Sequence, residues 1–447
     1  MKHIVLLALF GVAGIASGQT PPVQPQTPDI KIPPRVLMPG ETIEAGKQPL
    51  SVAEAVSIAL KNQPQIGIAQ GNLESAQGRT QQARSNLLPQ FGVSTTYSQS
   101  SPIFGGSSSA SGSNRFSSAL SVDQLLFDFG RTRDSVRSQT ALERAAQFTV
   151  TQTQQSVVSA VKTAYYDFQQ NQQFRQIAED NLTNTKRQLD EAQARLDSGL
   201  GAPGDVVQAK TNLASSVLAL EAARATESNS RVILAQQLGI NPLTPIVTTD
   251  TTGEQPLQDE SSLELLVQAA MTDRPDIKAA TERVNAARFA VGVAGKGDLP
   301  RISATAGVGS RGETSPFQSN TGTFGITLSW NFADSGFTAG AVRSAKGDQL
   351  AAQNNLLAIS QSAVTEISQT WMILQTAKQR IETAQDQVAN AQEYVRIAEG
   401  RYSGGLGQFL DVVSAQNSLV SAQRNLAQAQ QDVSRARAQL LAAVGRQ

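Results

Sequence analysis

The chain of 447 residues contains no cysteine and one histidine, His3. Without cysteine it has no disulfide bonds, thiolate metal sites or lipid-modified N-terminal cysteine. Zinc enzymes, histidine-dependent triads and histidine general bases are excluded as well, because the only histidine lies at the very start of the chain. Acidic and basic residues are scattered, with no carboxylate pair or nucleophile motif. The sequence therefore predicts that the protein is not an enzyme and uses no cofactor.

Long apolar runs are also scarce. The run Ile4–Ile15 spans 12 residues, too few for a membrane-spanning helix. It follows the basic Lys2 and precedes three small residues, so residues 1–18 are predicted to be a secretory signal peptide, although the cleavage site is not fixed. Residues 19–49 are rich in Pro and Gln and are expected to form an extended segment.

The chain also has no excess of positive or negative charge. The 37 basic and 37 acidic residues balance, and removal of the signal peptide leaves 36 basic against 37 acidic residues. No basic patch interrupts this balance, so nucleic acid is not an expected partner.

What the sequence does contain is an internal duplication. Residues 50–240 and 260–447 follow one plan, and their landmarks recur at spacings of 206 to 211 residues. A duplication of this size predicts two pseudo-symmetric halves within one architecture. The paired landmarks are Leu88–Pro89 with Leu299–Pro300, Asp128 with Asp334, Gly130 with Gly336, and Arg195–Val207 with Arg401–Val413.

Four segments alternate between apolar and small polar residues with a period of two. They cover about residues 88–100, 116–127, 299–310 and 322–333, each near the ten residues that a tilted strand needs to cross a membrane. Their polar face is mostly Ser, Gly, Thr and Asn with almost no charge. This favours a barrel wall with lipid outside and water inside over the alternative, a strand of a soluble sandwich.

Four strands cannot close a membrane barrel, and an open edge in lipid leaves backbone groups unpaired. Other copies of the chain must therefore complete it. Two copies would give a small barrel filled by side chains, and three would leave a lumen. The small residues on the polar face favour three copies.

Long helices complete each half. At 1.5 Å per residue the two longest would span roughly 100 Å each. The last helix carries a seven-residue repeat with large residues at one core position, beginning at Val412, and alanine at the other, beginning at Ala415. The predicted helices cover about residues 65–87, 131–197, 205–238, 276–297, 338–402 and 411–444.

This doubled order of helix, strand pair, long helix, glycine turn and return helix resembles the TolC-like outer-membrane efflux proteins over about residues 50–445. The resemblance implies a mainly α fold with a membrane β-barrel part. It further implies a homotrimer with a 12-stranded β-barrel, four strands per chain, in the outer membrane, continued by a 12-helix α-barrel tunnel in the periplasm.

The function that the resemblance implies is the exit duct of a tripartite efflux or type I secretion system. Such a duct hydrolyses nothing, and it works with a periplasmic adaptor protein and an inner-membrane pump. The cargo and the pump are not identified by the sequence. The alternative is a trimeric coiled-coil protein with a structural or adhesive role and a barrel anchor.

The resemblance also assigns roles at two predicted hairpin tips, about residues 196–205 and 402–411. The pairs Gly199–Leu200 and Gly405–Leu406 match the residues on which the family's adaptor docks. A glycine that ends a helix in a left-handed conformation is expected at both tips in any case.

The second site is a gate. Asp411 matches the family's constricting aspartate, which forms a ring in the trimer, and Tyr402 with Asp205 matches a pair that ties the inner hairpin to the outer one. Asp205 and Asp411 also stand where a helix N-cap is expected. Two departures from the family weaken the expected closure: Ser414 replaces a second aspartate, and Gly407 replaces an arginine that latches the tip.

Overall fold

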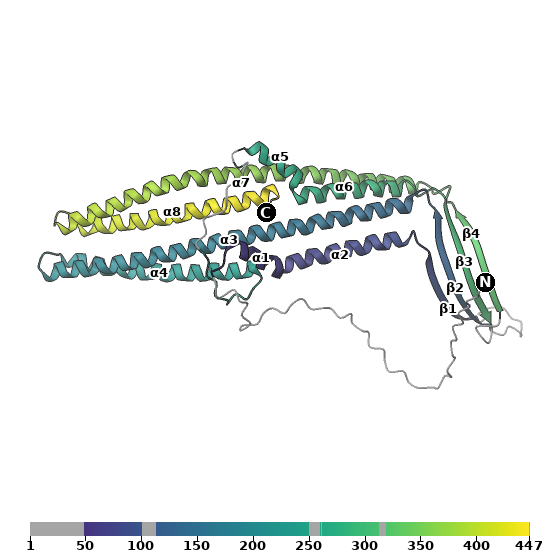
Figure 1. The fold of residues 1–447 in the computed structure, drawn as a ribbon, viewed down its shortest axis with the longest axis horizontal. Coiled ribbons are helices and arrows are strands. Elements are labelled where there is room, and N and C mark those ends of the chain that lie inside the picture. Colours follow the sequence, from purple (N-terminus) through teal and green to yellow (C-terminus); the bar gives the residue numbers. More distant parts are fainter. Residues whose placement is uncertain (1–48, 101–112, 250–259, 261, 313–318, 447) are drawn as a thin grey trace, which may run out of the picture. The chain divides into compact units, whose positions relative to one another are not determined.

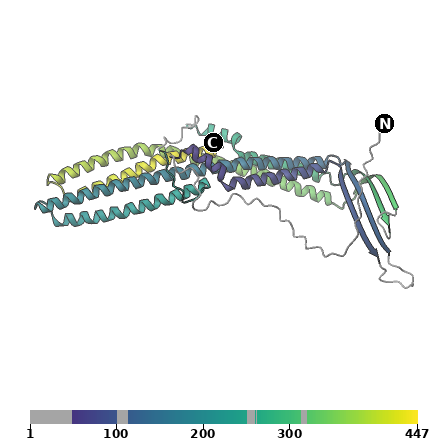
Figure 2. The same cartoon turned by 60° about the horizontal axis from the view of Figure 1, so that its bottom comes forward.

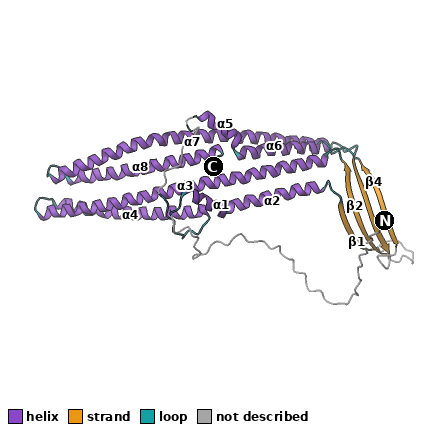
Figure 3. Cartoon of the chain, in the orientation of Figure 1, coloured by secondary structure: helices purple, strands orange, loops and turns teal. Residues whose placement is uncertain are grey.

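The computed structural model describes residues 49–100, 113–249, 260, 262–312 and 319–446, all within one unit, Thr42–Gln447. The predicted signal peptide and all but the last residue of the 19–49 segment lie outside the described residues. The described part is mainly helical, with one four-stranded sheet (Figure 3). None of its helices is both long enough and apolar enough to cross a membrane.

The same order of elements occurs twice along the described chain (Figure 1). Each half has two short helices, two strands and two long helices. The first half consists of α1 (Val52–Asn62), α2 (Pro64–Ser85), β1 (Gln90–Ser100), β2 (Ser113–Phe127), α3 (Arg131–Asp197) and α4 (Pro203–Leu238). The second consists of α5 (Leu263–Asp273), α6 (Pro275–Ala294), β3 (Arg301–Gly312), β4 (Ser319–Ser329), α7 (Phe337–Ser403) and α8 (Phe409–Val444).

The strand ends differ from the prediction by a few residues. β2 begins at Ser113 rather than 116 because its first residues pair with the end of β1. β4 ends at Ser329, although the alternation continues to Phe332. Beyond this end the indole of Trp330 donates a hydrogen bond to the carbonyl of Asp298, at 3.0 Å, and so turns back toward the start of β3.

The sheet is antiparallel throughout, in the order β1-β2-β3-β4, and β2 and β3 join the two halves. Val93, Leu120 and Val308 lie side by side on one face, and the neighbouring row includes Phe91 and Phe324. These apolar side chains are exposed, Val93 by 81%. The sheet therefore presents an apolar face that nothing in the described chain covers, and β1 and β4 each have one edge without a partner strand among the described residues.

The turn that leads from strand to long helix is the same in both halves. Gly130 and Gly336 adopt φ angles of +81° and +89°, which favour glycine. Asp128 accepts hydrogen bonds from the backbone N–H of Gly130, at 3.0 Å, and of Thr132, at 2.7 Å. Asp334 does the same with Gly336, at 3.1 Å, and with Thr338, the second residue of α7, at 2.7 Å. This repeated aspartate cap explains why the Asp-x-Gly landmark recurs.

The helices form a layer in the order α4, α3, α8, α7, in which each helix packs against the next (Figures 1 and 2). α4 and α7 are the outer members, and neither packs on the other in the described chain. Toward the sheet, α2 takes the place of α4 beside α3, and α6 packs between α3 and α7. The free edges of the helical layer thus lie on the same sides as the free edges of the sheet.

The hairpin of α7 and α8, called here the second hairpin, packs through the predicted alanine repeat. Every alanine of the series on α8 is buried. A matching series on α7 is buried opposite it, so the two helices approach closely along their length. The buried alanines are Ala415, Ala422, Ala429, Ala436 and Ala443 on α8 and Ala377, Ala384, Ala391 and Ala398 on α7.

Candidate functional site at the hairpin tips

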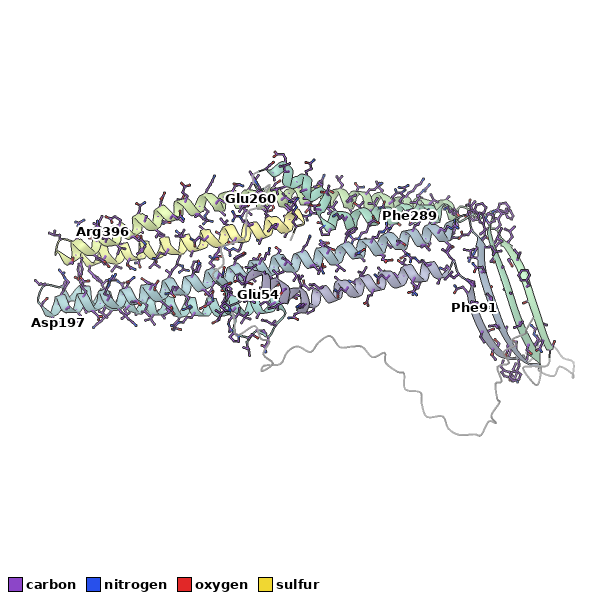
Figure 4. The ribbon with its side chains drawn as sticks, viewed as in Figure 1. Glu54, Phe91, Asp197, Glu260, Phe289 and Arg396 are labelled. Atoms are coloured by element: carbon purple, nitrogen blue, oxygen red, sulfur yellow. The ribbon has the colours of Figure 1, made fainter. Side chains whose placement is uncertain are left out.

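The first hairpin, α3 and α4, and the second hairpin end in similar glycine turns, beside the labelled Asp197 and Arg396 in Figure 4. Gly199 and Gly405 have φ angles of +75° and +71°. The following N–H groups fold back onto the last helical turn: Leu200 donates to the carbonyl of Arg195 at 2.9 Å, and Leu406 donates to its counterpart at 2.8 Å. This is a glycine-terminated helix end.

The turn aims one leucine at each tip into solvent. Leu200 is 77% exposed and Leu406 is 79% exposed, although leucine is usually buried. No Cβ contact would arise within 4 Å if Gly199 or Gly405 were replaced, so the space around both glycines is open. The four residues predicted for docking therefore form two small protruding tips.

Gly407 has a steric role that the sequence did not indicate. A Cβ at this position would lie 3.0 Å from the Cβ of Arg401, and one at Gly201 would lie 2.8 Å from the backbone nitrogen of Leu196. Both glycines allow the turn to pass close under the end of its own helix. Position 407, where the family's arginine is replaced by glycine, is therefore one at which a side chain would be crowded.

The predicted N-cap positions of Asp205 and Asp411 are wrong by three residues. α4 begins at Pro203 with Ala202 as its N-cap, and α8 has Gln408 as its N-cap, so each aspartate occupies the third helical position. At α4 the helix starts upstream because Pro203 is well suited to a first helical turn, and at α8 Gln408 and Asp411 form a capping box. At α8 the carboxylate of Asp411 still caps the helix, accepting from the N–H of Gln408 at 3.4 Å, and its side chain is exposed.

The structure brings Tyr402 and Asp205 together across the two hairpins. The Tyr402 hydroxyl donates to the Asp205 carboxylate at 3.3 Å. The tyrosine ring is 6% exposed and packs against Phe409, with ring centroids 5.5 Å apart. Burial raises the pKa of Tyr402, and the negative charge of Asp205 raises it further, so the hydroxyl stays protonated and remains a donor at neutral pH.

Arg195 is a contact residue that sequence reasoning treated only as a landmark of the repeat. Its guanidinium lies 4.7 Å from the centroid of the Tyr402 ring, and its Nη1 donates to the carbonyl of Ser403 at 3.1 Å. Above it, Arg187 pairs with Glu399 at 3.2 Å. Arginine therefore does join the two tips, from the first hairpin instead of position 407. The sequence feature that could have indicated this role is the arginine that precedes both turns, Arg195 and Arg401.

Below these polar contacts lies a small apolar cluster, called here the tip cluster. It draws residues from all four long helices and includes Tyr402, Phe409 and Val412. Its other buried members are Ala192, Val206, Ala209, Ala398, Val413 and Ala415. The cluster packs the ends of the two hairpins against each other, so the Tyr402–Asp205 bond sits at the edge of an apolar contact.

Other chemistry is sparse in the described residues. Across those residues, no group of three or more His, Cys, Asp or Glu side chains could hold a metal ion. The site is thus a contact between two helical hairpins of the same chain, each of which ends in an exposed glycine-leucine tip.

The chain combines a four-stranded sheet that has two free edges with a layer of four long helices packed side by side. This is the architecture of an outer-membrane channel protomer. The chain belongs to the outer membrane efflux protein family, whose sequence model matches residues 55–240 and 266–446. The two matched segments correspond to the two halves of the duplication. This membership confirms the predicted family and disfavours the adhesive alternative.

Individual relatives agree with this assignment. The outer membrane efflux protein BepC of Brucella suis is 28% identical over 268 residues, which cover 59% of this chain and 57% of BepC. The probable efflux pump outer membrane protein TtgC of Pseudomonas putida is 26% identical over 272 residues, or 58% of this chain and 54% of TtgC. The chain therefore spans just over half the length of these curated relatives.

Solved structures show the same fold. The structure of CusC aligns with a TM-score of 0.80 at 22% identity, covering 89% of this chain and 92% of CusC. That of the Campylobacter jejuni CmeC outer membrane channel aligns with a TM-score of 0.79 at 20% identity, covering 88% and 85%. These likenesses confirm the predicted TolC-like fold of the single chain.

Proposed function

We propose that the protein is the exit duct of a tripartite efflux or type I secretion system, set in the cell outer membrane and extending into the periplasm. The observation that carries this proposal is the coincidence of free edges: β1 and α4 on one side of the chain, β4 and α7 on the other. A chain built in this way is a segment of a wall rather than a closed body.

Three copies close the wall. In this arrangement β4 of one copy pairs with β1 of the next, and α7 packs on the neighbour's α4. Three sets of four strands make a 12-stranded β-barrel, wide enough to hold a lumen. The four-helix-wide layer becomes a 12-helix tunnel in the same way. Closure pairs every strand edge, which removes the unpaired backbone groups that lipid does not tolerate.

The two faces of the sheet differ in polarity, which indicates which face meets lipid and which faces the lumen. The face with Phe91, Val93 and Phe324 suits contact with outer-membrane lipid. The opposite face carries Ser121, Gly307 and other small or polar residues, which suit a water-filled lumen. A passive conduit needs nothing more, so the duct hydrolyses nothing and its energy comes from an inner-membrane pump.

The tips are the expected contact with the periplasmic adaptor. Leu200 and Leu406 are apolar groups held in water by a turn whose glycines leave room for a close approach. An exposed leucine on a rigid turn is a suitable knob for a helical hairpin of a partner.

The gate combines two devices. The exposed Asp411 of each copy contributes one carboxylate to a ring around the axis, and a cation between like charges would obstruct the passage. The Tyr402–Asp205 bond and the Arg195 contacts hold the second hairpin against the first. Opening then requires these contacts to separate.

Mass measurement of the detergent-purified protein tests the assembly. We expect a particle of three chains, and single-channel currents when it is added to a planar bilayer. A stable monomer that gives no channels would contradict the proposed function.

A further inference from the structure

A polar cavity of about 320 Å³, open to solvent on the side of Ser215, Ala219 and Asn417, lies between the two hairpins on the sheet side of the tip cluster. Its walls come from α3, α4 and α8. All the side chains that line it are uncharged, and most of them are amides or hydroxyls. None of its lining residues is among those proposed above for docking and gating, although Val413 also belongs to the tip cluster.

Three amide side chains in this cavity each leave one buried atom without a partner among the described residues. They are the Oδ1 of Asn181, the Nε2 of Gln188 and the Nδ2 of Asn212. Gln188 is 5% exposed, so water has little access to it from outside the cavity. Buried polar atoms almost always have a hydrogen-bond partner, and three orphan atoms around one space indicate that the partner occupies that space.

The remaining polar groups shape the cavity without needing a ligand. Thr185 and Ser216 hydrogen-bond each other across α3 and α4, at 2.7 Å, and both are buried. Gln416, also buried, faces the cavity from α8. The second hairpin therefore contributes an amide wall opposite the orphan atoms.

The chemistry of the walls selects the class of ligand. The orphan atoms comprise two donors, on Gln188 and Asn212, and one acceptor, on Asn181. A hydroxyl group can serve either kind because it both donates and accepts. A charged ligand would lose its hydration without gaining a counter-charge, since no Asp, Glu, Lys or Arg lines the cavity. The volume equals that of about ten water molecules, which suits one sugar ring.

We propose that this cavity binds a small neutral polyhydroxyl molecule, a sugar or a polyol, between the two hairpins. Binding itself does not depend on the proposed channel function, because it needs only the contacts within one chain. Where the gate works as proposed, a bound ligand that touches α4 and α8 together also favours the closed arrangement of the hairpins.

The test measures binding of D-glucose to the purified full-length protein by saturation-transfer NMR and calorimetry, with the anion gluconate as the charged counterpart of similar size. We expect saturable glucose binding and none of gluconate. Gln188→Met removes one orphan donor while keeping the length of the side chain, and it should weaken glucose binding about five- to tenfold. Gln379→Met, at an exposed position of α7, is the matched control and should bind like the wild type.

The unliganded proteins provide a second readout. Replacement of an unsatisfied buried amide by an apolar group of similar shape is neutral or favourable, so Gln188→Met should melt at or above the wild-type temperature. Asn212→Leu is the second variant and should weaken binding in the same way. Absence of saturable glucose binding, equal binding of gluconate, or unchanged affinity in both variants would overturn the proposal. The cavity would then hold water alone or a partner's side chain.

Discussion

The bond between Tyr402 and Asp205 predicts how firmly the two hairpins are held together. Tyr402→Phe removes one hydroxyl and leaves the ring in the tip cluster, so the apolar packing is preserved. A hydrogen bond to a charged group contributes about 1.5–3 kcal/mol. At 3.3 Å, and with Asp205 partly exposed, we expect about 1 kcal/mol after screening by water.

This energy sets the expected change in gating. About 1 kcal/mol shifts the closed-to-open equilibrium of one chain by about fivefold. If three copies open together, the product is roughly 125-fold. Because the raised pKa of Tyr402 keeps the hydroxyl protonated, the effect should be constant across neutral pH.

Planar-bilayer recording measures this shift as the fraction of time spent at high conductance. Tyr394→Phe is the control, since this tyrosine lies on the same helix and is 44% exposed. A double-mutant cycle with Asp205→Ala should give a combined effect smaller than the sum of the two, because both changes break one bond. If Tyr402→Phe gates like Tyr394→Phe, the bond does not hold the hairpins and the reasoning fails.

Three further predictions concern the gate, the tips and the strand-to-helix turn. Asp411→Ala should raise single-channel conductance and weaken block by divalent cations; lower thermal stability with unchanged conductance and block would mean that Asp411 only caps α8. Gly405→Leu should abolish efflux in a complementation assay while trimers persist, since its left-handed φ costs only about 1–2 kcal/mol, whereas Gly347→Leu in an exposed part of α7 should transport normally. Hydrogen bonds from Thr338 hold the pKa of Asp334 below its usual range, so its contribution to stability is present above pH of about 4 and is lost as pH falls through the lowered pKa. Thermal melting between neutral and acidic pH should therefore depend less on pH in Asp334→Asn, and an identical dependence would contradict the cap.

Periodicity in the sequence was sufficient to predict most elements of the fold. The period of two located all four strands, and the seven-residue alanine series predicted the buried face of α8. The predicted positions of helix and strand ends were less accurate. The end of β4 depends on Trp330 contacting Asp298, and the start of α8 depends on Gln408, neither of which follows from periodicity.

The tip site was predicted in part, because glycine turns are local features. The left-handed Gly199 and Gly405 follow from the residues beside them. The contacts of Arg195 with Tyr402 and Ser403 join positions about 200 residues apart in the sequence. They depend on how the first hairpin is aligned lengthwise against the second, which is set where α3 packs on α8. The orphan amides around the cavity depend on the same alignment of helices, so sequence patterns within one helix could not reveal them.

The free edges of β1 and β4 also bear on how the protein is made. A newly exported chain has two unpaired strand edges and an apolar sheet face before it meets its copies. Such edges pair readily with any other strand, including those of misfolded neighbours. The monomer should therefore be short-lived in water, and its yield should depend on escort by a holding chaperone and on the concentration of fellow chains. In the proposed trimer, every strand edge of the sheet is paired only once the ring of copies is complete, so the measured stability should depend on protein concentration.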